Sequence, residues 1–383
     1  MKPLDKILLY FPNARHLTKV AEGVTEFSFS YGKWSIYPHT VQLPEMDQNW
    51  EAGHWMVDYD WTGVITSFPR HGFIQRLKAQ GIPVVGVEHE PSSGLPLIRG
   101  DDRAIGKMAF EHLRGLGHTR FAFWGTERLS RMRLRGEGFE EEVRREGLKW
   151  VTPSRVSGYS GGDEAMQAWL SEIEAPAAVF AQYVMDARRL LVNCVRLDIA
   201  VPEEIAILGV DDDELLCRAN RPTLSTIDQG CHRIGYRAAE ILADWIDGKA
   251  PPPEEPVLIE PSGVRQRRST SQAVIEDPLV SRAMEYIWQH AREGIRVSDV
   301  SDSVHCSRRT LEMQFVKIMG RTIHSEIVRA RLGHARTLLA ETRISLGEIA
   351  ERCGYAWQGQ FTRAFNESFG ENPSTYRKRV WGH

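Results

Sequence analysis

The stretch Ser345-Leu-Gly-Glu-Ile-Ala-Glu-Arg-Cys-Gly354-Tyr-Ala-Trp-Gln-Gly-Gln-Phe361-Thr-Arg-Ala-Phe365 lies near the end of this 383-residue chain. It begins with a short amphipathic segment, turns at Gly354 and continues as a second amphipathic segment. Two helices joined by a glycine turn form the helix-turn-helix unit, whose second helix enters a DNA major groove. The sequence therefore predicts a DNA-binding protein.

A second copy of this pattern occupies residues 297–315. The buried-type positions Val300, Ser301 and Val304 correspond to Ile349, Ala350 and Cys353 at an offset of 49 residues, and Leu311 and Phe315 correspond to Phe361 and Phe365 at 50. We expect Ser307 to cap the second helix of this copy and a long helix over residues 323–339 to join the two copies. His305 stands where the other copy has its turn glycine, and histidine tolerates a positive φ less well than glycine.

Charge is distributed unevenly along the chain. Residues 278–383 contain 16 Lys and Arg against 11 Asp and Glu, a net charge of +5, which leaves −8 on the rest because the whole chain carries −3. A basic C-terminal part on an acidic body is typical of a nucleic-acid contact confined to one end.

The preceding part, residues 5–262, alternates short apolar runs with amphipathic stretches. The expected strands are 6–11, 63–66, 84–87, 121–124, 178–181, 205–210 and 224–227. The clearest expected helices are 18–29, 72–80, 104–116, 136–146, 164–170, 186–197 and 233–246. This alternation predicts an α/β fold with parallel sheets, and the number of units favours two lobes.

Several classes of function find no support in the sequence. There is no apolar run near the length of a membrane span, no cysteine and histidine spacing typical of zinc, no phosphate-binding glycine loop and no GxSxG motif. The five cysteines are far apart in the sequence, which favours free thiols and a cytoplasmic protein. We expect no metal, no cofactor and no enzymatic activity.

The N-terminal part resembles the effector domain of LacI-type regulators, which is similar to the periplasmic sugar-binding proteins. The resemblance rests on Gly81-Ile-Pro-Val-Val-Gly-Val87, Asp101-Asp-Arg-Ala-Ile-Gly106, His112-Leu-Arg-Gly-Leu-Gly-His118, Arg133-Leu-Arg-Gly-Glu-Gly-Phe139 and Gly209-Val-Asp-Asp212, in this order. It implies a two-lobed, periplasmic-binding-protein-like domain that closes on a small sugar.

Ligands of such folds bind beyond the carboxyl ends of strands, where polar loops converge. This rule selects ten candidate ligand-binding residues: Asn13, Arg15, Glu88, His89, Arg131, Arg133, Tyr183, Asp186, Asp211 and Asp212. Carboxylates and guanidinium groups bind pairs of sugar hydroxyls, and an aromatic ring packs on the C–H face of a sugar. Alternatives remain open, because Asp186 can be a helix cap and the other acids and arginines can be structural or solvated.

The C-terminal part, from about 280 to 380, resembles the AraC/XylS family of regulators, whose signature includes the ending Asn372-Pro-Ser-Thr-Tyr-Arg377. The resemblance implies an all-α domain with DNA-contacting side chains at Arg308, Arg309, Glu312, Met313, Trp357, Gln358, Gln360, Thr362 and Arg363. Arginine reads guanine, glutamine reads adenine, and threonine contacts the thymine methyl group. Phosphate contact or exposure to solvent is the alternative for each of them.

Together the two resemblances imply a sugar-responsive transcription activator. The expected domains are a sensing domain over residues 1–265, a linker over 266–278 and an AraC-type domain over 279–383. The implied partners are promoter DNA, RNA polymerase, a pentose effector (D-xylose) and a second copy of the chain. The alternative is a cytoplasmic sugar-binding or carbohydrate-processing protein with a vestigial helical tail.

Overall fold

The computed structural model describes residues 4–381, except 13, 42–58, 92–93, 127–128, 152–161 and 272–276. The chain divides into two compact units. The first consists of Met1–Gly106, Thr126–Gly138 and Gln229–Pro261, and the second of Lys107–Gly125, Phe139–Asp228 and Ser262–His383.

The first unit is built on a six-stranded sheet in the order β11-β5-β4-β3-β1-β2. Its strands are β1 (Asp5–Pro12), β2 (Trp34–Val41), β3 (Gly63–Thr66), β4 (Val84–Val87), β5 (Leu97–Gly100) and β11 (Val257–Ile259), and all pairs are parallel. The predicted strands β1, β3 and β4 are confirmed. The strand β2 was not predicted. It contains Pro38, which argues against a central strand, but β2 lies at the edge of the sheet, where proline is tolerated.

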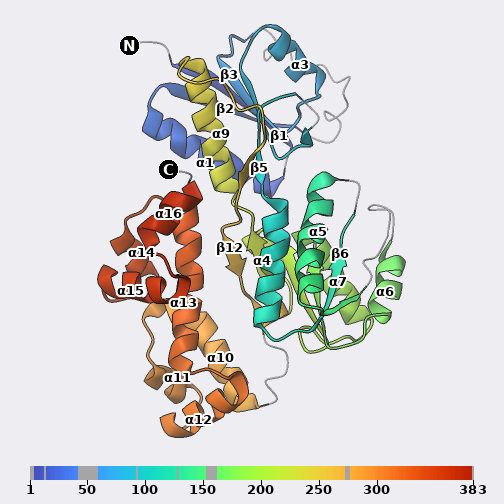
Figure 1. Cartoon of the computed structure of the whole chain (residues 1–383), viewed down its shortest axis with the longest axis vertical. Coiled ribbons are helices and arrows are strands. Elements are labelled where there is room, and N and C mark those ends of the chain that lie inside the picture. The colour runs from blue at the N-terminus through green and yellow to red at the C-terminus, as the bar shows by residue number, and fades with distance from the viewer. Residues whose placement is uncertain are drawn as a thin grey trace. The chain divides into compact units, whose positions relative to one another are not determined.

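Two helices of the first unit, α1 (Arg15–Tyr31) and α9 (Cys231–Ile246), lie side by side (Figure 1). Their backbones approach closely at two glycines. A Cβ atom on Gly23 would lie 1.9 Å from the carbonyl oxygen of His232, and one on Gly235 would lie 1.9 Å from that of Val20. Only glycine fits at these two positions, so the helix crossing is fixed by the sequence. The shorter α3 (Gly72–Ala79) packs against β4.

The second unit contains a six-stranded sheet in the order β12-β10-β9-β8-β6-β7. Its strands are β6 (Arg120–Trp124), β7 (Lys149–Val151), β8 (Ala177–Ala181), β9 (Ile205–Val210), β10 (Ser225–Asp228) and β12 (Gly263–Arg265). Among the described strands of this sheet, β12 runs antiparallel to β10 and the other pairs are parallel. The helices are α6 (Asp163–Ser171), α7 (Val184–Arg196) and α8 (Glu214–Arg218), and two further helices, α4 (Asp102–Gly115) and α5 (Ser130–Arg145), include residues of both units. The predicted α/β class is confirmed.

The second unit ends in a set of helices that we call the reader helices (Figure 1). They are α10 (Pro278–His290), α11 (Val297–Ser303), α12 (Arg308–Met319), α13 (Ile323–Glu341), α14 (Leu346–Arg352), α15 (Gln358–Phe369) and α16 (Pro373–Trp381). The pairs α11–α12 and α14–α15 are the two predicted helix-turn-helix motifs. The long helix between them is confirmed as α13.

Each motif has its own hydrophobic core, and α13 contributes to both. Ile323 and Ile327 pack into the first core, with Leu311 and Phe315. Leu332 and Leu339 pack into the second, with Phe361 and Phe365. The predicted repeat therefore corresponds to two similar hydrophobic cores, and side chains of α13 belong to both.

Candidate nucleic-acid interface and ligand site

The turns of the two motifs have the same backbone conformation although their residues differ. Gly354 has a φ of 75° and His305 a φ of 54°. As predicted, Ser307 caps α12, and its hydroxyl accepts the backbone N–H of Thr310 at 3.3 Å. The second motif uses Ser345 in the same way to cap α14. Histidine in the left-handed region makes the first turn the more strained one.

The nine residues predicted to contact DNA lie on α12, on α15 and at the residue that precedes α15. Seven of them are exposed, and Glu312 and Thr362 are half-buried. Met313 and Trp357 are large apolar side chains with exposed fractions of 67% and 65%. Arg308 forms an ion pair with Glu312 at 3.0 Å, and Arg363 lies 3.8 Å from Glu367. The exposed surface of these helices therefore includes both polar and apolar side chains.

Arg331 holds the two motifs together from the middle of α13. Its Nε atom donates to the carbonyl oxygen of Ala291 and its Nη2 atom to that of Ile295, both at 2.8 Å. The same guanidinium stacks on the ring of Tyr355, 5.5 Å from its centroid. Because Tyr355 belongs to the second motif and Ile295 precedes the first, this side chain fixes their relative placement.

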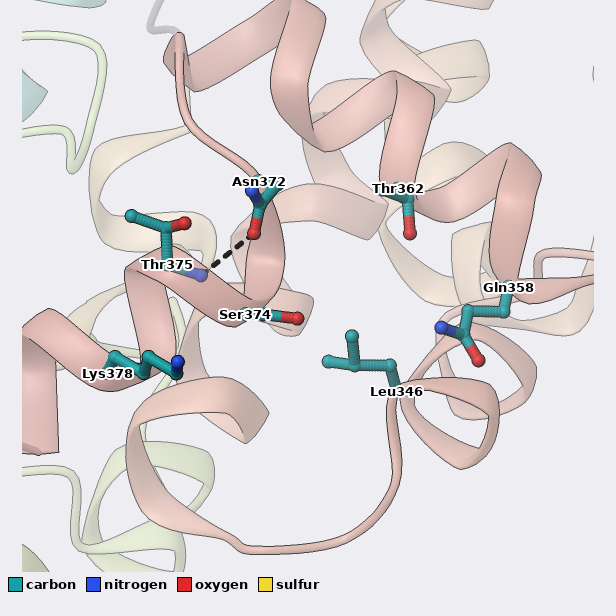
Figure 2. A pocket seen from close by; sticks show the side chains of 7 residues that line it. All are labelled: Leu346, Gln358, Thr362, Asn372, Ser374, Thr375 and Lys378. Carbon is teal, nitrogen blue, oxygen red and sulfur yellow. Dashed lines mark hydrogen bonds between the residues drawn. The ribbon is translucent and has the colours of Figure 1, made fainter. Parts of the chain in front are cut away.

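A groove, which we call the α15–α16 groove, opens beside α15. It has a volume of about 450 Å³. Leu346, Gln358 and Thr362 line one side. The other side is formed by the start of α16 and by Lys378, whose side chain reaches into the groove (Figure 2). The amide oxygen of Asn372 accepts the backbone N–H of Thr375 at 2.8 Å (Figure 2).

Two of the predicted ligand residues follow β4 in the first unit. One carboxylate oxygen of Glu88 accepts the backbone N–H of Gly100 at 2.8 Å, and the other lies 3.9 Å from Arg131. The Nδ1 atom of His89 donates to the carbonyl oxygen of Glu90 at 2.8 Å. Burial lowers the pKa of His89 below its ordinary value. The lowered pKa favours the neutral ring, whose lone pair lies on Nε2 because Nδ1 donates.

The other predictions in the first unit have different outcomes. Arg133 is exposed and pairs with Glu137 at 2.5 Å, one helical turn further along α5. Arg15 is the first residue of α1. Asn13 lies outside the described residues. The structure thus brings Glu88, His89 and Arg131 together and places Arg133 on a solvated helix face.

In the second unit, β8 and β9 are neighbours, so the residues that follow them share one edge of the sheet. Tyr183 is the N-cap residue of α7. Asp186 is buried and accepts from the side chain of Gln182 at 2.9 Å, and burial raises the pKa of this carboxyl. Asp211 is buried and has a positive φ of 79°. Gln182 was missed, although it directly follows a predicted strand.

Asp212 makes contacts that the sequence analysis did not anticipate. Its side chain is only 1% exposed and lies 2.6 Å from Arg267 and 3.0 Å from Arg265. The hydroxyl of Thr226 donates to the same carboxylate at 3.0 Å. Arg265 is the last residue of the expected sensing domain and Arg267 lies in the expected linker. Both pair with Asp212.

The segment after β12 is anchored to the second sheet. The 3-10 helix η3 (Arg268–Thr270) has two buried residues. The hydroxyl of Ser269 donates to the carbonyl oxygen of Ile207 at 2.6 Å, and the hydroxyl of Thr270 lies 3.1 Å from the Nε2 atom of His112. Residues 266–270 of the predicted linker are therefore part of the packed structure.

A buried polar network in the first unit was also missed. Arg135 donates to Asp102 at 2.8 Å and to the side chain of Gln229 at 2.7 Å. Asp102 also pairs with Arg99. Asp101 and Asp102 both precede the helical stretch, where an aspartate is expected to cap. Asp101 does cap, since it accepts the backbone N–H of Ala104 at 3.0 Å, whereas Asp102 is bound by the two arginines. Arg131, Arg133 and Arg135 alternate along the sequence, and only the structure shows that Arg135 is the buried one of these three.

Two kinds of feature are missing from the described part of the chain. No group of three or more His, Cys, Asp or Glu side chains there is arranged to hold a metal ion. Within the same ranges, no helix has both the length and the apolar character needed to cross a membrane.

Comparisons with known proteins agree with the two kinds of domain. Residues 110–270 match a periplasmic binding protein-like domain, and residues 300–379 match a helix-turn-helix domain. The chain is 33% identical to the xylose operon regulatory protein of Escherichia coli strain K12, over 97% of this chain and 96% of that protein. The Haemophilus influenzae protein of the same name is 30% identical over 97% of each chain.

A solved structure of a xylose-binding transcription activator, xylR, has a TM-score of 0.59 and 30% identity, and covers 99% of both chains. A LacI family regulator from Enterococcus faecium, solved with bound ribose, covers 70% of this chain with a TM-score of 0.55 and 20% identity, which supports the fold alone. Both domains thus occur in the same order, over nearly the whole length, in the relatives. The chain belongs to the family of the xylose operon regulatory proteins, sugar-responsive transcription regulators that bind DNA.

Proposed function

We propose that this chain activates a pentose catabolic operon when D-xylose binds to its N-terminal domain. The observation that carries the proposal is the similarity to the xylose operon regulatory protein along 97% of the chain, through both domains. The proposed domains remain 1–265, 266–278 and 279–383, with residues 266–270 of the linker packed on the second sheet. In this proposal the protein acts in the cytoplasm and catalyses no reaction.

His89 is the best-supported sugar contact in the first unit. Its Nε2 atom is buried and has no hydrogen-bond partner among the described residues. A neutral imidazole accepts a hydrogen bond there, and a sugar hydroxyl is a suitable donor. Arg131, held beside Glu88, supplies a guanidinium group for a second hydroxyl. Asn13 and Arg15 follow β1 and stay in the proposed set.

In the second unit, we assign Asp211, Asp186 and Tyr183 to the sugar. They follow two neighbouring parallel strands, and ligands bind beyond the carboxyl ends of such strands. Asp212 has a different role in the proposal, because both of its oxygens already face arginines. We infer that it connects the sensing domain to the segment that leads to the reader helices.

We also propose that two copies of the chain associate through α7 and α8. Met185, Val192 and Val195 recur at helical spacing on the exposed face of α7, and Leu215 is exposed on the neighbouring α8. A self-complementary apolar face favours a symmetric dimer. Sedimentation of the full chain tests this: Val195→Asp should shift a dimer to a monomer, whereas Leu258→Asp, an equally apolar exposed position in the first unit, should not.

The DNA-bound dimer would then recruit RNA polymerase. Two motifs in each chain, fixed by Arg331, would enter major grooves about one turn (~34 Å) apart. The sugar acts by binding one conformation of the protein more tightly than the other.

Calorimetric titration of the full chain with D-xylose tests the function, with L-arabinose, D-ribose and D-glucose as controls. Saturable binding of D-xylose alone is the expected result. Selective binding of another sugar would replace the effector and leave the regulator in place. Binding of none of the four would overturn the proposed effector.

A further inference from the structure

The α15–α16 groove has a wall of hydrogen-bond donors. Ser374 and Thr375 contribute hydroxyl groups, and Lys378 contributes an ammonium group that points toward Leu346 and Gln358 on the opposite wall (Figure 2). The oxygen of Asn372 is engaged by Thr375, which leaves the NH₂ group of this amide as a further donor. One wall is therefore suited to a ligand that accepts several hydrogen bonds.

The charge around the groove is positive. No acidic residue is among those that line it. The two nearest acids in the sequence are paired elsewhere: Glu371 with Arg379 at 2.8 Å and Glu348 with Arg352 at 2.7 Å. Among the described ion pairs none involves Lys378, so its charge is not neutralised by a neighbouring carboxylate. The groove therefore favours an anion.

The opposite wall belongs to the helix that we propose reads the bases. Gln358 and Thr362 are two of its expected base contacts and also line the groove. A helix in a major groove lies between the two phosphate backbones that border it, so a side chain within reach of a base edge has a phosphate nearby. Lysine, serine, threonine and asparagine are typical phosphate contacts in protein–DNA complexes, and such contacts set the register of the reading helix.

From these three observations we propose that the α15–α16 groove holds a phosphodiester group of the bound DNA duplex, with Lys378 as its charged contact. The ligand class is a backbone phosphate with its flanking sugars, for which the groove volume suffices. Lys378 and the two hydroxyl groups act as positioning residues, because they set how deeply α15 lies in the major groove. The inference rests on the proposed reading role of α15.

The salt dependence of DNA binding tests the proposal. A duplex is first selected by the full-length protein from a random-sequence pool, and binding is then measured at several salt concentrations. Lys378→Gln should reduce the slope of log K against log [salt] by about 0.9, the value for one lost phosphate contact. Lys378→Arg should retain the slope, since the charge is kept. Lys107→Gln, a matched loss of one lysine charge on α4, should leave the slope unchanged.

A second measurement separates a phosphate contact from a base contact. Each phosphate of the selected duplex is replaced in turn by a neutral methylphosphonate. In each site bound by a second motif, one such replacement should lower the DNA affinity of the wild-type protein about tenfold, which is about 1.4 kcal/mol. The Lys378→Gln variant should be insensitive at that phosphate, and its discrimination between matched and mismatched base pairs should remain as in wild type.

Two outcomes count against the phosphate contact, and a third counts against the proposed function on which it rests. An unchanged salt slope in Lys378→Gln, or sensitivity to the same methylphosphonate in variant and wild type, overturns the phosphate contact while the reading role of α15 stands. If the random pool yields no preferred sequence, the proposed function fails, and the groove inference fails with it.

Discussion

The carboxylate of Asp212 lies 2.6 Å from the guanidinium of Arg267, a residue 55 positions further along the chain. Arg267 also donates to the carbonyl oxygen of Leu224 at 2.9 Å. Asp212 directly follows Asp211, one of the proposed sugar contacts, and Arg267 directly precedes η3. A shift of the loop after β9 would therefore displace Arg267, which stands at the start of the segment that leads to the reader helices.

We predict that Asp212→Asn separates sugar binding from the DNA response. Sugar affinity should change by less than about tenfold, 1.4 kcal/mol, because the amide retains an acceptor for Thr226. The difference in DNA affinity with and without sugar should be lost, because the ion pairs to Arg265 and Arg267 are gone. Calorimetry and DNA binding on the same preparation measure the two quantities, and a thermal melt checks the fold. Loss of sugar binding itself would instead identify Asp212 as a sugar contact.

Arg267→Gln provides the reciprocal test from the other side of the ion pair. It should impair the DNA response in the same direction and leave sugar affinity intact. Arg144→Gln is the matched control, since Arg144 is an exposed arginine that pairs with Glu140 at 2.5 Å on α5. Equal effects of both substitutions would show that charge alone, and not the bond to Asp212, matters.

Replacement of Arg331 by methionine should destabilise the reader helices and loosen the two motifs. Two carbonyl oxygens, those of Ala291 and Ile295, would lose their donor, and each unsatisfied buried group costs about 1–3 kcal/mol. Chemical denaturation followed by tryptophan fluorescence measures the loss. Arg282→Met, at an exposed position of α10, should cost little. Similar costs for both would refute the bridging role of Arg331.

Arg363→Ala should relax the preference for one base pair at a cost of about 1–3 kcal/mol. The side chain of Arg363 is 83% exposed and its nearest acid is 3.8 Å away, so the guanidinium is free to reach a guanine. Binding to a panel of single-base variants of a selected duplex reveals the change. Arg352→Ala, in the same motif but paired with Glu348, should leave the preference intact. A uniform loss over all sequences would mean that Arg363 contacts phosphate.

Stability should fall on acidification below pH 6.5, in part because of His112. Burial lowers the pKa of His112 to about 3, so the folded protein holds this ring neutral. The unfolded chain binds a proton there below pH 6.5, and unfolding is therefore favoured as pH falls from 6.5 toward 3. The contribution is complete above pH 6.5 and declines by about 1.4 kcal/mol per pH unit below it.

His112→Gln should reduce the pH dependence of the unfolding free energy by the share of one histidine, while an amide keeps contact with Thr270. Denaturant titrations at pH 7.5, 6 and 5 measure the slope. His16→Gln, near the start of α1, is the comparison. An identical slope in wild type and His112→Gln would mean that His112 is protonated in the folded protein.

The sequence alone determined the architecture, because the signals for it are local. Runs such as Ile205–Val210 are apolar throughout, as a strand buried on both faces must be, and this strand has the predicted bounds. The cap at Ser307 follows from a hydroxyl that can accept a backbone N–H of the first helical turn, and the turn at Gly354 follows from the positive φ that glycine tolerates. The repeat of Leu311 and Phe315 in Phe361 and Phe365 reflects helical periodicity, which is also a short-range property.

Which polar side chains meet became clear only from the packing of distant segments. Asp212 was predicted from its place after a strand, but its partners come from β12 and from the residue before η3, and no pattern in the sequence pairs positions so far apart. The same holds for Arg135 with Gln229 and for Arg331 with Ala291, and for the groove that joins Thr362 to Lys378. Strand and helix formation depend on neighbours in sequence, whereas ion pairs and grooves depend on where the chain brings distant segments together, and that is set only when the cores pack.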